Sequence, residues 1–258
     1  MSRIIAVGGK GGVGKTLIVS LLTKILQKEY DLLSIDADPA LGITYAIGAS
    51  PEMTIWDIRE ALKEGPGRQE MLSGDRDVPL KDVIRDRALI NMEGFDFLVM
   101  GRSEGPGCFC GINDLLRYAI DSLARSYEIV LVDCEAGIEQ VNRRVLRNTD
   151  TLVLVTDPTV RGVQTVCRLE QIAREYSADS GAFRTGLLFN RVYDESVLDN
   201  LKKEVDIDIW GYLPDDPVIK EFDLQGRSLL EFPESSPLYQ TLMSVVSRLM
   251  GYEKENKE

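Results

Sequence analysis

The chain has 258 residues, of which 44% are apolar, and this length and composition suit one large α/β domain. Its 42 acidic side chains outnumber 30 basic ones, and the net charge of −12 argues against a surface built for nucleic acid or an anionic membrane. No apolar run reaches the ~18 residues that a membrane span needs, and the N-terminus carries no secretory pattern, so we expect a cytoplasmic protein. The absence of histidine excludes a Ser-His or Cys-His catalytic pair within the chain.

A phosphate-binding motif stands near the start of the chain. Residues 9–16 read Gly-Lys-Gly-Gly-Val-Gly-Lys-Thr, which fits the pattern G-x-x-x-x-G-K-[ST]. The run at 3–7 is short, apolar and β-branched, and apolar residues recur at helical spacing from Leu17 to Leu26. The motif is therefore predicted to lie between a strand and a helix, which is the context that a phosphate-binding loop requires. A glycine-rich turn that binds nothing is the alternative.

The residues of this loop have expected roles in holding a triphosphate. Glycines let backbone N–H groups close around phosphate oxygens, and the following helix N-terminus adds partial positive charge. Lys15 is expected to reach the β- and γ-phosphates, and the hydroxyl of Thr16 is expected to bind Mg²⁺. The predicted nucleotide contacts of this segment are Gly9, Lys10, Gly11, Gly12, Val13, Gly14, Lys15, Thr16 and Leu17.

Short aliphatic runs alternate with segments of helical spacing along the rest of the chain. Strands are predicted at 32–36, 95–100, 129–133, 152–156, 186–190 and, as an edge strand, 207–211, and helices at 112–126, 161–176, 194–204 and 236–250. This alternation predicts a doubly wound, mostly parallel α/β sheet of about seven strands, with ligands at the carboxyl ends of the strands. Residues 63–94 are polar and rich in turns, so they are expected to form an excursion with one or two short helices, either a partner surface or solvated filler.

Lys10 narrows the class of the phosphate-binding loop. With this lysine, the loop resembles the deviant Walker A motif of the MinD/ParA/nitrogenase-iron-protein ATPases. The resemblance implies that Lys10 reaches across a homodimer interface to the nucleotide of the partner. Because phosphoryl transfer needs cations around the γ-phosphate, hydrolysis of ATP would then depend on dimerisation. A solvated loop lysine is the alternative.

Two aspartate segments resemble the switch regions of the same family. Asp38, in the Asp-Ala-Asp-Pro segment after the second strand, resembles the switch I aspartate, which implies that it orients the attacking water and contacts Mg²⁺. Asp133 ends the most aliphatic strand, as a Walker B aspartate that holds Mg²⁺ through water, and Gly137 would approach the γ-phosphate. The structural alternatives are an Asp-Pro turn and a helix N-cap followed by a turn glycine.

Two further segments resemble the base-binding elements of this family. Asn190 and Arg191 stand at the end of a predicted strand, and the amide of Asn190 matches the N6 and N7 edge of adenine. Pro214, Asp215 and Asp216 resemble the loop that closes over the base. A guanine-specific N-K-x-D motif is absent, so ATP and ADP are favoured over guanine nucleotides. For Asn190 the alternative is a cap at the strand end.

Cys108 and Cys110 form a C-x-C pair between a predicted strand end and a predicted helix. Two thiols can bind one soft metal ion, but they do not complete a tetrahedral site, and the chain has no histidine to help. A homodimer in which two such pairs face each other would give a four-sulfur site for one soft metal ion. By contrast, Cys134 and Cys167 are expected to be packed as small apolar residues.

The C-x-C pair and the segment that follows Asp133 together resemble the CooC/AcsF-type nickel-insertion ATPases, which mature carbon monoxide dehydrogenase and acetyl-CoA synthase. The resemblance covers nearly the whole chain and implies one P-loop ATPase domain over 1–258. It implies an ATP-hydrolysing metallochaperone that dimerises, uses Mg²⁺ and serves such a client enzyme. It also implies that Cys108 and Cys110 of both subunits bind Ni²⁺ or Zn²⁺. Some relatives carry a histidine where this chain has Gln140, so the role of that histidine is not carried over.

Other interpretations stay open. The two thiols could be unliganded, form a redox dithiol, or bind a bridging [4Fe–4S] cluster in a reductase component like the nitrogenase iron protein. A MinD- or ParA-like spatial switch is a further alternative. A membrane anchor of that kind would need a basic amphipathic helix, but 237–250 carries only Arg248 as a strong cation, and a net charge of −12 disfavours a DNA-binding face. We therefore expect no nucleic-acid or membrane partner.

Overall fold

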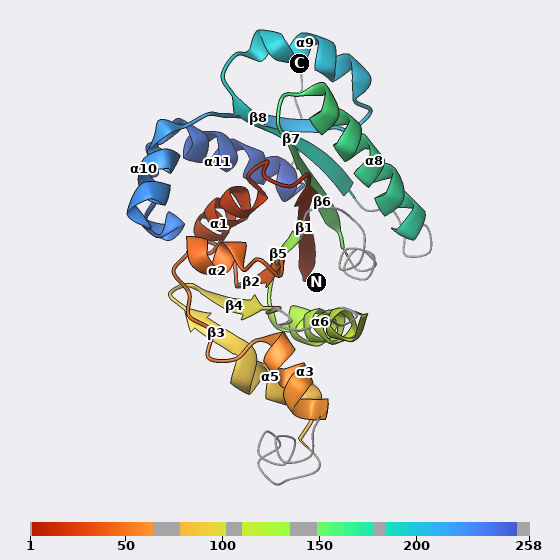
Figure 1. The fold of residues 1–258 in the computed structure, drawn as a ribbon, viewed down its shortest axis with the longest axis vertical. Coiled ribbons are helices and arrows are strands. Elements are labelled where there is room, and N and C mark those ends of the chain that lie inside the picture. The colour runs from red at the N-terminus through yellow and green to blue at the C-terminus, as the bar shows by residue number, and fades with distance from the viewer. Residues whose placement is uncertain (1, 64–77, 102–109, 135–148, 178–183, 252–258) are drawn as a thin grey trace.

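The computed structural model describes residues 2–63, 78–101, 110–134, 149–177 and 184–251 (Figure 1). These residues build an eight-stranded sheet in the order β3-β4-β2-β5-β1-β6-β7-β8. All neighbouring strands are parallel except β3 and β4, which are antiparallel. The prediction of a doubly wound, mostly parallel sheet is confirmed, with one strand more than the sequence suggests.

The helices and strands follow one another in the predicted alternation. The strands are β1 (Arg3–Gly9), β2 (Leu32–Ala37), β3 (Leu89–Met92), β4 (Phe95–Val99), β5 (Ile129–Cys134), β6 (Thr151–Thr156), β7 (Arg184–Val192) and β8 (Ile209–Pro214). The helices are α1 (Lys15–Leu26), α2 (Gly42–Ala46), α3 (Ile55–Lys63), α5 (Leu80–Ala88), α6 (Cys110–Leu123), α8 (Val160–Ser177), α9 (Leu198–Leu201), α10 (Pro217–Gln225) and α11 (Pro237–Leu249). Short 3₁₀ turns are η1 (Ala124–Ser126), η3 (Glu195–Val197), η4 (Lys202–Glu204) and η5 (Leu229–Glu231).

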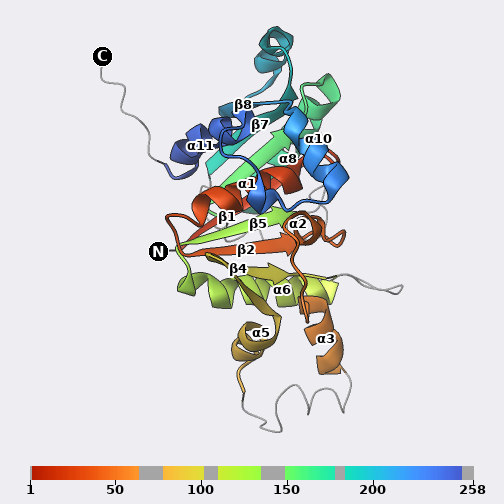
Figure 2. The same cartoon turned by 90° about the vertical axis from the view of Figure 1, so that its left-hand side faces the viewer.

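The sheet carries a hydrophobic core on each face. Every residue of β2, β5 and β6 is buried, as their aliphatic runs predict for parallel strands covered on both sides. Helices α1, α10 and α11 pack on one face, and α6 and α8 pack on the other, which Figures 1 and 2 show from two directions. The site must therefore lie at an edge of the sheet, because both of its faces are filled.

The strand order brings three strand ends to one place. β1 lies between β5 and β6, and β2 lies on the other side of β5. In this register Asp133 stands beside Val7 of β1 and beside Asp36 of β2. The loop that follows β1 and the two aspartates therefore converge at the carboxyl edge of the sheet, as expected for a doubly wound fold.

Two segments differ from the sequence-based prediction. In the described part of 63–94, helix α5 is followed by β3, a four-residue edge strand that the sequence analysis does not predict. β3 is only partly buried, and a tight turn at Gly94 joins it to β4. Because it lacks the long aliphatic run of the inner strands, its sequence does not mark it as a strand. The helix predicted at 194–204 is wrong as a single element, because η3, α9 and η4 replace it. Its two buried residues, Leu198 and Leu201, supply too little apolar surface for a longer helix.

The C-terminal amphipathic helix α11 uses its apolar face inside the fold. Leu238, Leu242, Val245 and Leu249 are buried in the same core as α1 and β8. Among the helices that the structure describes, none is both long enough and apolar enough to cross a bilayer.

A candidate nucleotide-binding site

The phosphate-binding loop joins the end of β1 to the start of α1, as predicted. Gly9 ends the strand so close to β6 that a Cβ atom at this position would lie 2.2 Å from the carbonyl oxygen of Val155. Gly14 is the N-cap of α1 in the left-handed conformation, with φ at 93°, and as a glycine it has no side chain that could cap the helix. The first N–H groups of α1 are therefore left available to an anion.

The two lysines of the loop lie in different environments. The side chain of Lys15 is buried, and its ammonium group donates a hydrogen bond to the carbonyl oxygen of Lys10 at 3.4 Å. Lys10 itself is exposed to solvent. Lys15 is thus held inside the loop, where it can meet a phosphate, whereas the side chain of Lys10 is accessible to a second molecule.

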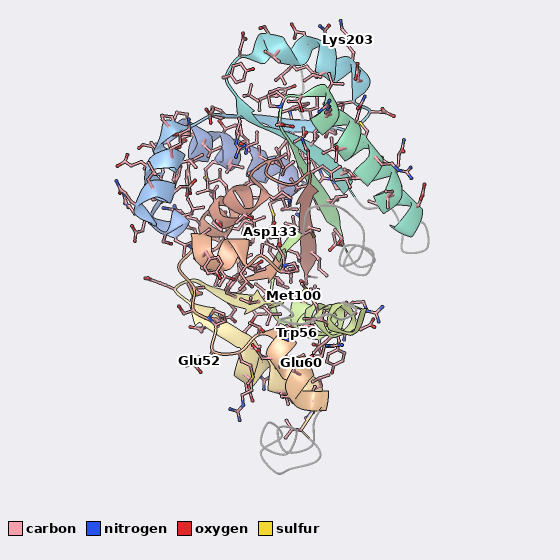
Figure 3. All side chains as sticks on the ribbon, in the orientation of Figure 1. Glu52, Trp56, Glu60, Met100, Asp133 and Lys203 are labelled. Carbon is pink, nitrogen blue, oxygen red and sulfur yellow. The ribbon has the colours of Figure 1, made fainter. Side chains whose placement is uncertain are left out.

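Thr16 and Asp133 form the pair that fits a magnesium ion. The hydroxyl of Thr16 donates to Oδ2 of Asp133 at 2.9 Å, and the other carboxylate oxygen is buried without a hydrogen-bond partner in the described part of the chain. Burial, helped by the charge of the neighbouring Asp36, raises the pKa of Asp133 to about 7. A buried carboxylate with an unpaired oxygen beside a threonine hydroxyl is the donor set that hydrated Mg²⁺ takes. Figure 3 shows Asp133 at the centre of the molecule.

Asp36 organises the segment that carries Asp38. Its buried carboxylate accepts hydrogen bonds from the backbone N–H of Thr44 at 3.0 Å, from the Thr44 hydroxyl at 2.8 Å and from the N–H of Asp38 at 3.2 Å. Burial raises the pKa of Asp36 above its ordinary value. Asp38 is half-buried and accepts from the N–H of Ala40 at 2.8 Å. The sequence pointed to Asp38 and missed the organising role of Asp36, which depends on its contact with Thr44.

Gly42 is a further site residue that the sequence analysis missed. It begins α2, and a Cβ atom at this position would lie 2.8 Å from the hydroxyl oxygen of Thr16. The preceding Leu41 has a positive φ of 57°, which is uncommon for a residue with a side chain. The segment from Asp36 to Gly42 therefore reaches the side chain of Thr16, the predicted magnesium ligand. A glycine six residues after Asp36 was the only signal in the sequence.

A cavity of about 400 Å³ lies beside the phosphate-binding loop, between α1, α2 and α10. Leu17 and Arg191, which the sequence predicts as nucleotide contacts, line this cavity together with Thr16. Its walls also contain Tyr45 and Phe222, and the volume lies in the range of small-molecule sites. The cavity is therefore placed to receive the part of a ligand that extends away from the phosphates.

The remaining predicted base contacts are placed differently. Asn190 is buried, and its amide donates to the carbonyl oxygen of Val13 at 2.8 Å. Asp216 is buried as the N-cap of α10, where it accepts from the N–H of Val218 at 3.0 Å and from the hydroxyl of Ser236. Asp215 is exposed, and Pro214 ends β8. Their contacts with a base stay predictions.

The predicted metal-binding pair cannot be placed. Cys108 and Gly137 lie outside the described residues, and for Cys110 only the backbone, at the start of α6, is described. Within the described residues there is no group of three or more Cys, Asp or Glu side chains placed to hold a metal ion. Cys134 is packed in the core, where burial raises the pKa of its thiol to about 12, and Cys167 is half-buried, so both are packed residues as predicted.

Two solved structures share the fold of this chain. A ParA family ATPase from Chlorobium tepidum superposes with a TM-score of 0.71 over 94% of this chain and 97% of its own, at 21% sequence identity. The cell division protein MinD of Aquifex aeolicus superposes with a TM-score of 0.70 over the whole of both chains, at 22% identity. The fold is therefore that of the MinD/ParA-like P-loop proteins.

Sequence comparison extends the likeness to the family. An ATP-binding protein of Methanocaldococcus jannaschii is 37% identical over 96% of this chain and 98% of its own length. The carbon monoxide dehydrogenase accessory protein CooC of Rhodospirillum rubrum is 31% identical over 96% of this chain and 97% of its own length. The profile of the CobQ/CobB/MinD/ParA nucleotide binding domain, CbiA, matches residues 4–229. The chain therefore belongs to the CobQ/CobB/MinD/ParA family of nucleotide-binding proteins.

Proposed function

We propose that the protein is an ATP-hydrolysing metallochaperone of the cytoplasm. It acts as a homodimer, binds Ni²⁺ or Zn²⁺ through Cys108 and Cys110 of both subunits, and assists nickel insertion into a carbon monoxide dehydrogenase or acetyl-CoA synthase. The observation that carries the proposal is the combination, in one chain, of a magnesium-ready phosphate site with a C-x-C pair. The likeness to CooC over nearly the full length of both chains supports the choice of client.

In the proposed reaction, the loop N–H groups and Lys15 bind the phosphates of ATP. Thr16 would hold Mg²⁺ directly and Asp133 through water, and the ion supplies positive charge to the transferring phosphoryl group. Asp38 is proposed to orient the attacking water, and its hydrogen bond from the N–H of Ala40 fixes the direction of its carboxylate.

Lys10 is proposed to complete the site of the partner subunit. Its exposed side chain leaves the loop on the solvent side, while Lys15 stays with the nucleotide of its own subunit. A cation supplied by the partner makes ATP hydrolysis depend on dimerisation. The same dimer would bring two C-x-C pairs together into one four-sulfur site.

Hydrogen bonds between β2, β4 and α3 support a coupling between nucleotide and metal. The N–H of Met100, at the end of β4, donates to the carbonyl oxygen of Asp36 at 2.8 Å, and the carbonyl oxygen of Met100 accepts from the N–H of Trp56 at 2.9 Å (Figure 3). The next residue, Gly101, lies so close to Thr54 that a Cβ atom would come within 2.2 Å of its hydroxyl oxygen. Gly101 is thus linked through Met100 to Asp36, and this link supports a coupling between the γ-phosphate and the C-x-C segment.

Metal analysis of the purified dimer tests the proposal. We expect about one Ni²⁺ or Zn²⁺ per dimer, since the symmetric site takes two thiols from each subunit. The double variant Cys108→Ser/Cys110→Ser should lose the metal and keep its affinity for ATP. Cys167→Ser is the matched control, because this half-buried thiol packs against the core, and it should retain the metal. An unchanged metal content in the double variant would contradict the assignment.

A further inference from the structure

The side chain of Asn190, near the end of β7, contacts the phosphate-binding loop. Its side chain is only 1% exposed, and its amide nitrogen donates to the carbonyl oxygen of Val13 at 2.8 Å. The two residues are 177 positions apart in the sequence. A buried carbonyl group is costly to leave without a partner, so this bond holds the peptide of Val13 in one orientation.

The same amide fits against Gly14. A Cβ atom on Gly14 would lie 2.4 Å from the amide nitrogen of Asn190, which is closer than any real contact allows. Gly14 has a positive φ and, as the glycine N-cap of α1, offers no side chain to the N–H groups that follow it. Asn190 therefore lies against the residue that sets the direction of the first free N–H groups of the helix.

The backbone of β7 departs from regular strand geometry at this position. Its register with β8 shifts between Phe189 and Val192, and Arg191 has a positive φ of 60°. Irregularities of this kind redirect a side chain relative to the sheet. Here the irregular stretch contains Asn190, whose side chain ends on the loop instead of on the neighbouring strand.

We propose that Asn190 is a positioning residue of the phosphate-binding loop: it holds Val13 and Gly14 in the conformation that presents the loop N–H groups to a triphosphate. This inference rests on the proposed nucleotide binding and extends it. An asparagine amide has two N–H donors and one acceptor oxygen, and the loop takes one donor. Asn190 could hold the loop in this way and also contact adenine. The two roles predict the loss of affinity for different ligands when the side chain is removed.

Ligands with and without a base separate these roles. Affinities of wild type and Asn190→Ala for Mg-ATP, Mg-GTP and Mg-tripolyphosphate can be measured by calorimetry. Loss of the brace should weaken all three by a similar factor, about tenfold, because the loop binds the phosphate chain that they share. A loss confined to Mg-ATP, or an unchanged affinity for tripolyphosphate, would overturn the proposal. Asn200→Ala, at an exposed position on α9, should change none of the three affinities.

Folding is checked first by circular dichroism and thermal unfolding. If Asn190→Ala does not fold, Asn190→Ser is used with the same three ligands, because serine retains a small polar group that is too short to make the bond. Its expected result is the same uniform weakening, and tripolyphosphate affinity equal to that of wild type would overturn the proposal. Failure of wild type to bind both Mg-ATP and tripolyphosphate would instead refute the proposed nucleotide function.

Discussion

Asp133, at the end of β5, and Asp216, after the end of β8, are both buried aspartates at the carboxyl edge of the same sheet. Asp216 has a partner for each carboxylate oxygen, the N–H of Val218 and the hydroxyl of Ser236. Asp133 has only Thr16 for one oxygen and no partner for the other within the described residues.

This difference separates the phosphate side of the proposed site from its predicted base side. On the phosphate side, around β1, β2 and β5, burial raises the pKa values of Asp36 and Asp133, and the charge of Asp36 raises that of Asp133 further. A negative charge in such surroundings is unfavourable without a nearby cation, so these carboxylates are suited to binding Mg²⁺. On the predicted base side, Asp216 has a partner for each carboxylate oxygen and Asn190 donates to the carbonyl oxygen of Val13, which suits residues that stabilise the structure around the site.

The largest effect is expected for Lys10→Ala on the phosphate side. If the lysine acts on the nucleotide of the partner, kcat for ATP hydrolysis should fall by about 10³-fold, as for other cations supplied to a transferring phosphoryl group. Affinity for Mg-ATP should change little. Steady-state hydrolysis at saturating Mg-ATP measures the effect, and Lys81→Ala, at an exposed lysine of α5, is the matched control.

Mixing two variants that are each strongly impaired sharpens this test. A subunit with Lys10→Ala keeps its own Thr16 and Asp133, and a subunit with Asp133→Asn keeps its own Lys10. A mixed dimer should therefore regain hydrolysis at one site, because one subunit supplies the lysine and the other the magnesium site. A mixture that stays inactive, although the subunits exchange, would show that the lysine does not act across an interface.

Asp133→Asn should separate activity from stability. Without the carboxylate, ATP hydrolysis should fall by about 100-fold, since Mg²⁺ loses a partner. The folded pKa of about 7 lies above the ordinary 3.8, so the folded state holds a proton that the unfolded state releases between these values. The free energy of unfolding therefore falls as pH rises from about 4 to 7, and the whole penalty is present above pH 7.

The variant lacks this penalty, so at pH 8 it should be more stable than wild type by roughly 1–4 kcal/mol. The gap should narrow toward pH 5. Thermal unfolding of both proteins in chelator, without nucleotide, measures it at several pH values. A gap that is independent of pH would mean that the buried carboxylate is not the cause, and the contrast with Asp216 would be lost.

The parts of the molecule that the sequence predicted well are those encoded by neighbouring residues. The phosphate-binding loop, its flanking strand and helix, and the aliphatic inner strands follow from local spacing and composition. β3 was missed because its four residues, three half-buried and one exposed, become a strand only through their pairing with β4. The single helix predicted at 194–204 was wrong, because helical spacing alone does not supply the buried apolar surface that a long helix needs.

In the site, the missing knowledge was about contacts between distant segments. The sequence identified Lys15, Thr16 and Asp133 by motif, and the structure brings the last two together. The fit of Gly42 against Thr16, and of Asn190 against Gly14, depends on how separate loops meet at the sheet edge, which no local pattern encodes. The single domain over 1–258 and the metal-binding role of the cysteines stay predictions.

Gly42→Ala should give a smaller loss on the phosphate side. Alanine suits the start of α2, but its Cβ atom would lie 2.8 Å from the hydroxyl oxygen and 3.2 Å from the methyl carbon of Thr16. Displacing Thr16 should weaken binding of Mg-ATP by about tenfold. Titration of the Mg²⁺ dependence of ATP binding measures this. Adding Thr16→Ser, which removes the methyl group and keeps the hydroxyl, should restore part of the affinity. No restoration would argue against a direct clash.

The smallest effect is expected for Asp216→Ala on the base side, and it should have the opposite sign in stability to Asp133→Asn. Removal of this carboxylate leaves the N–H of Val218 and the buried hydroxyl of Ser236 without their acceptor. The free energy of unfolding should fall by about 1–2 kcal/mol, the usual cost of losing a helix N-cap. Urea unfolding at pH 8 measures it, with Asp223→Ala, at an exposed position on α10, as the control. If Asp216→Ala were instead stabilising, both buried aspartates would destabilise the fold. The contrast between Asp133 as a cation ligand and Asp216 as a structural helix cap would then be wrong.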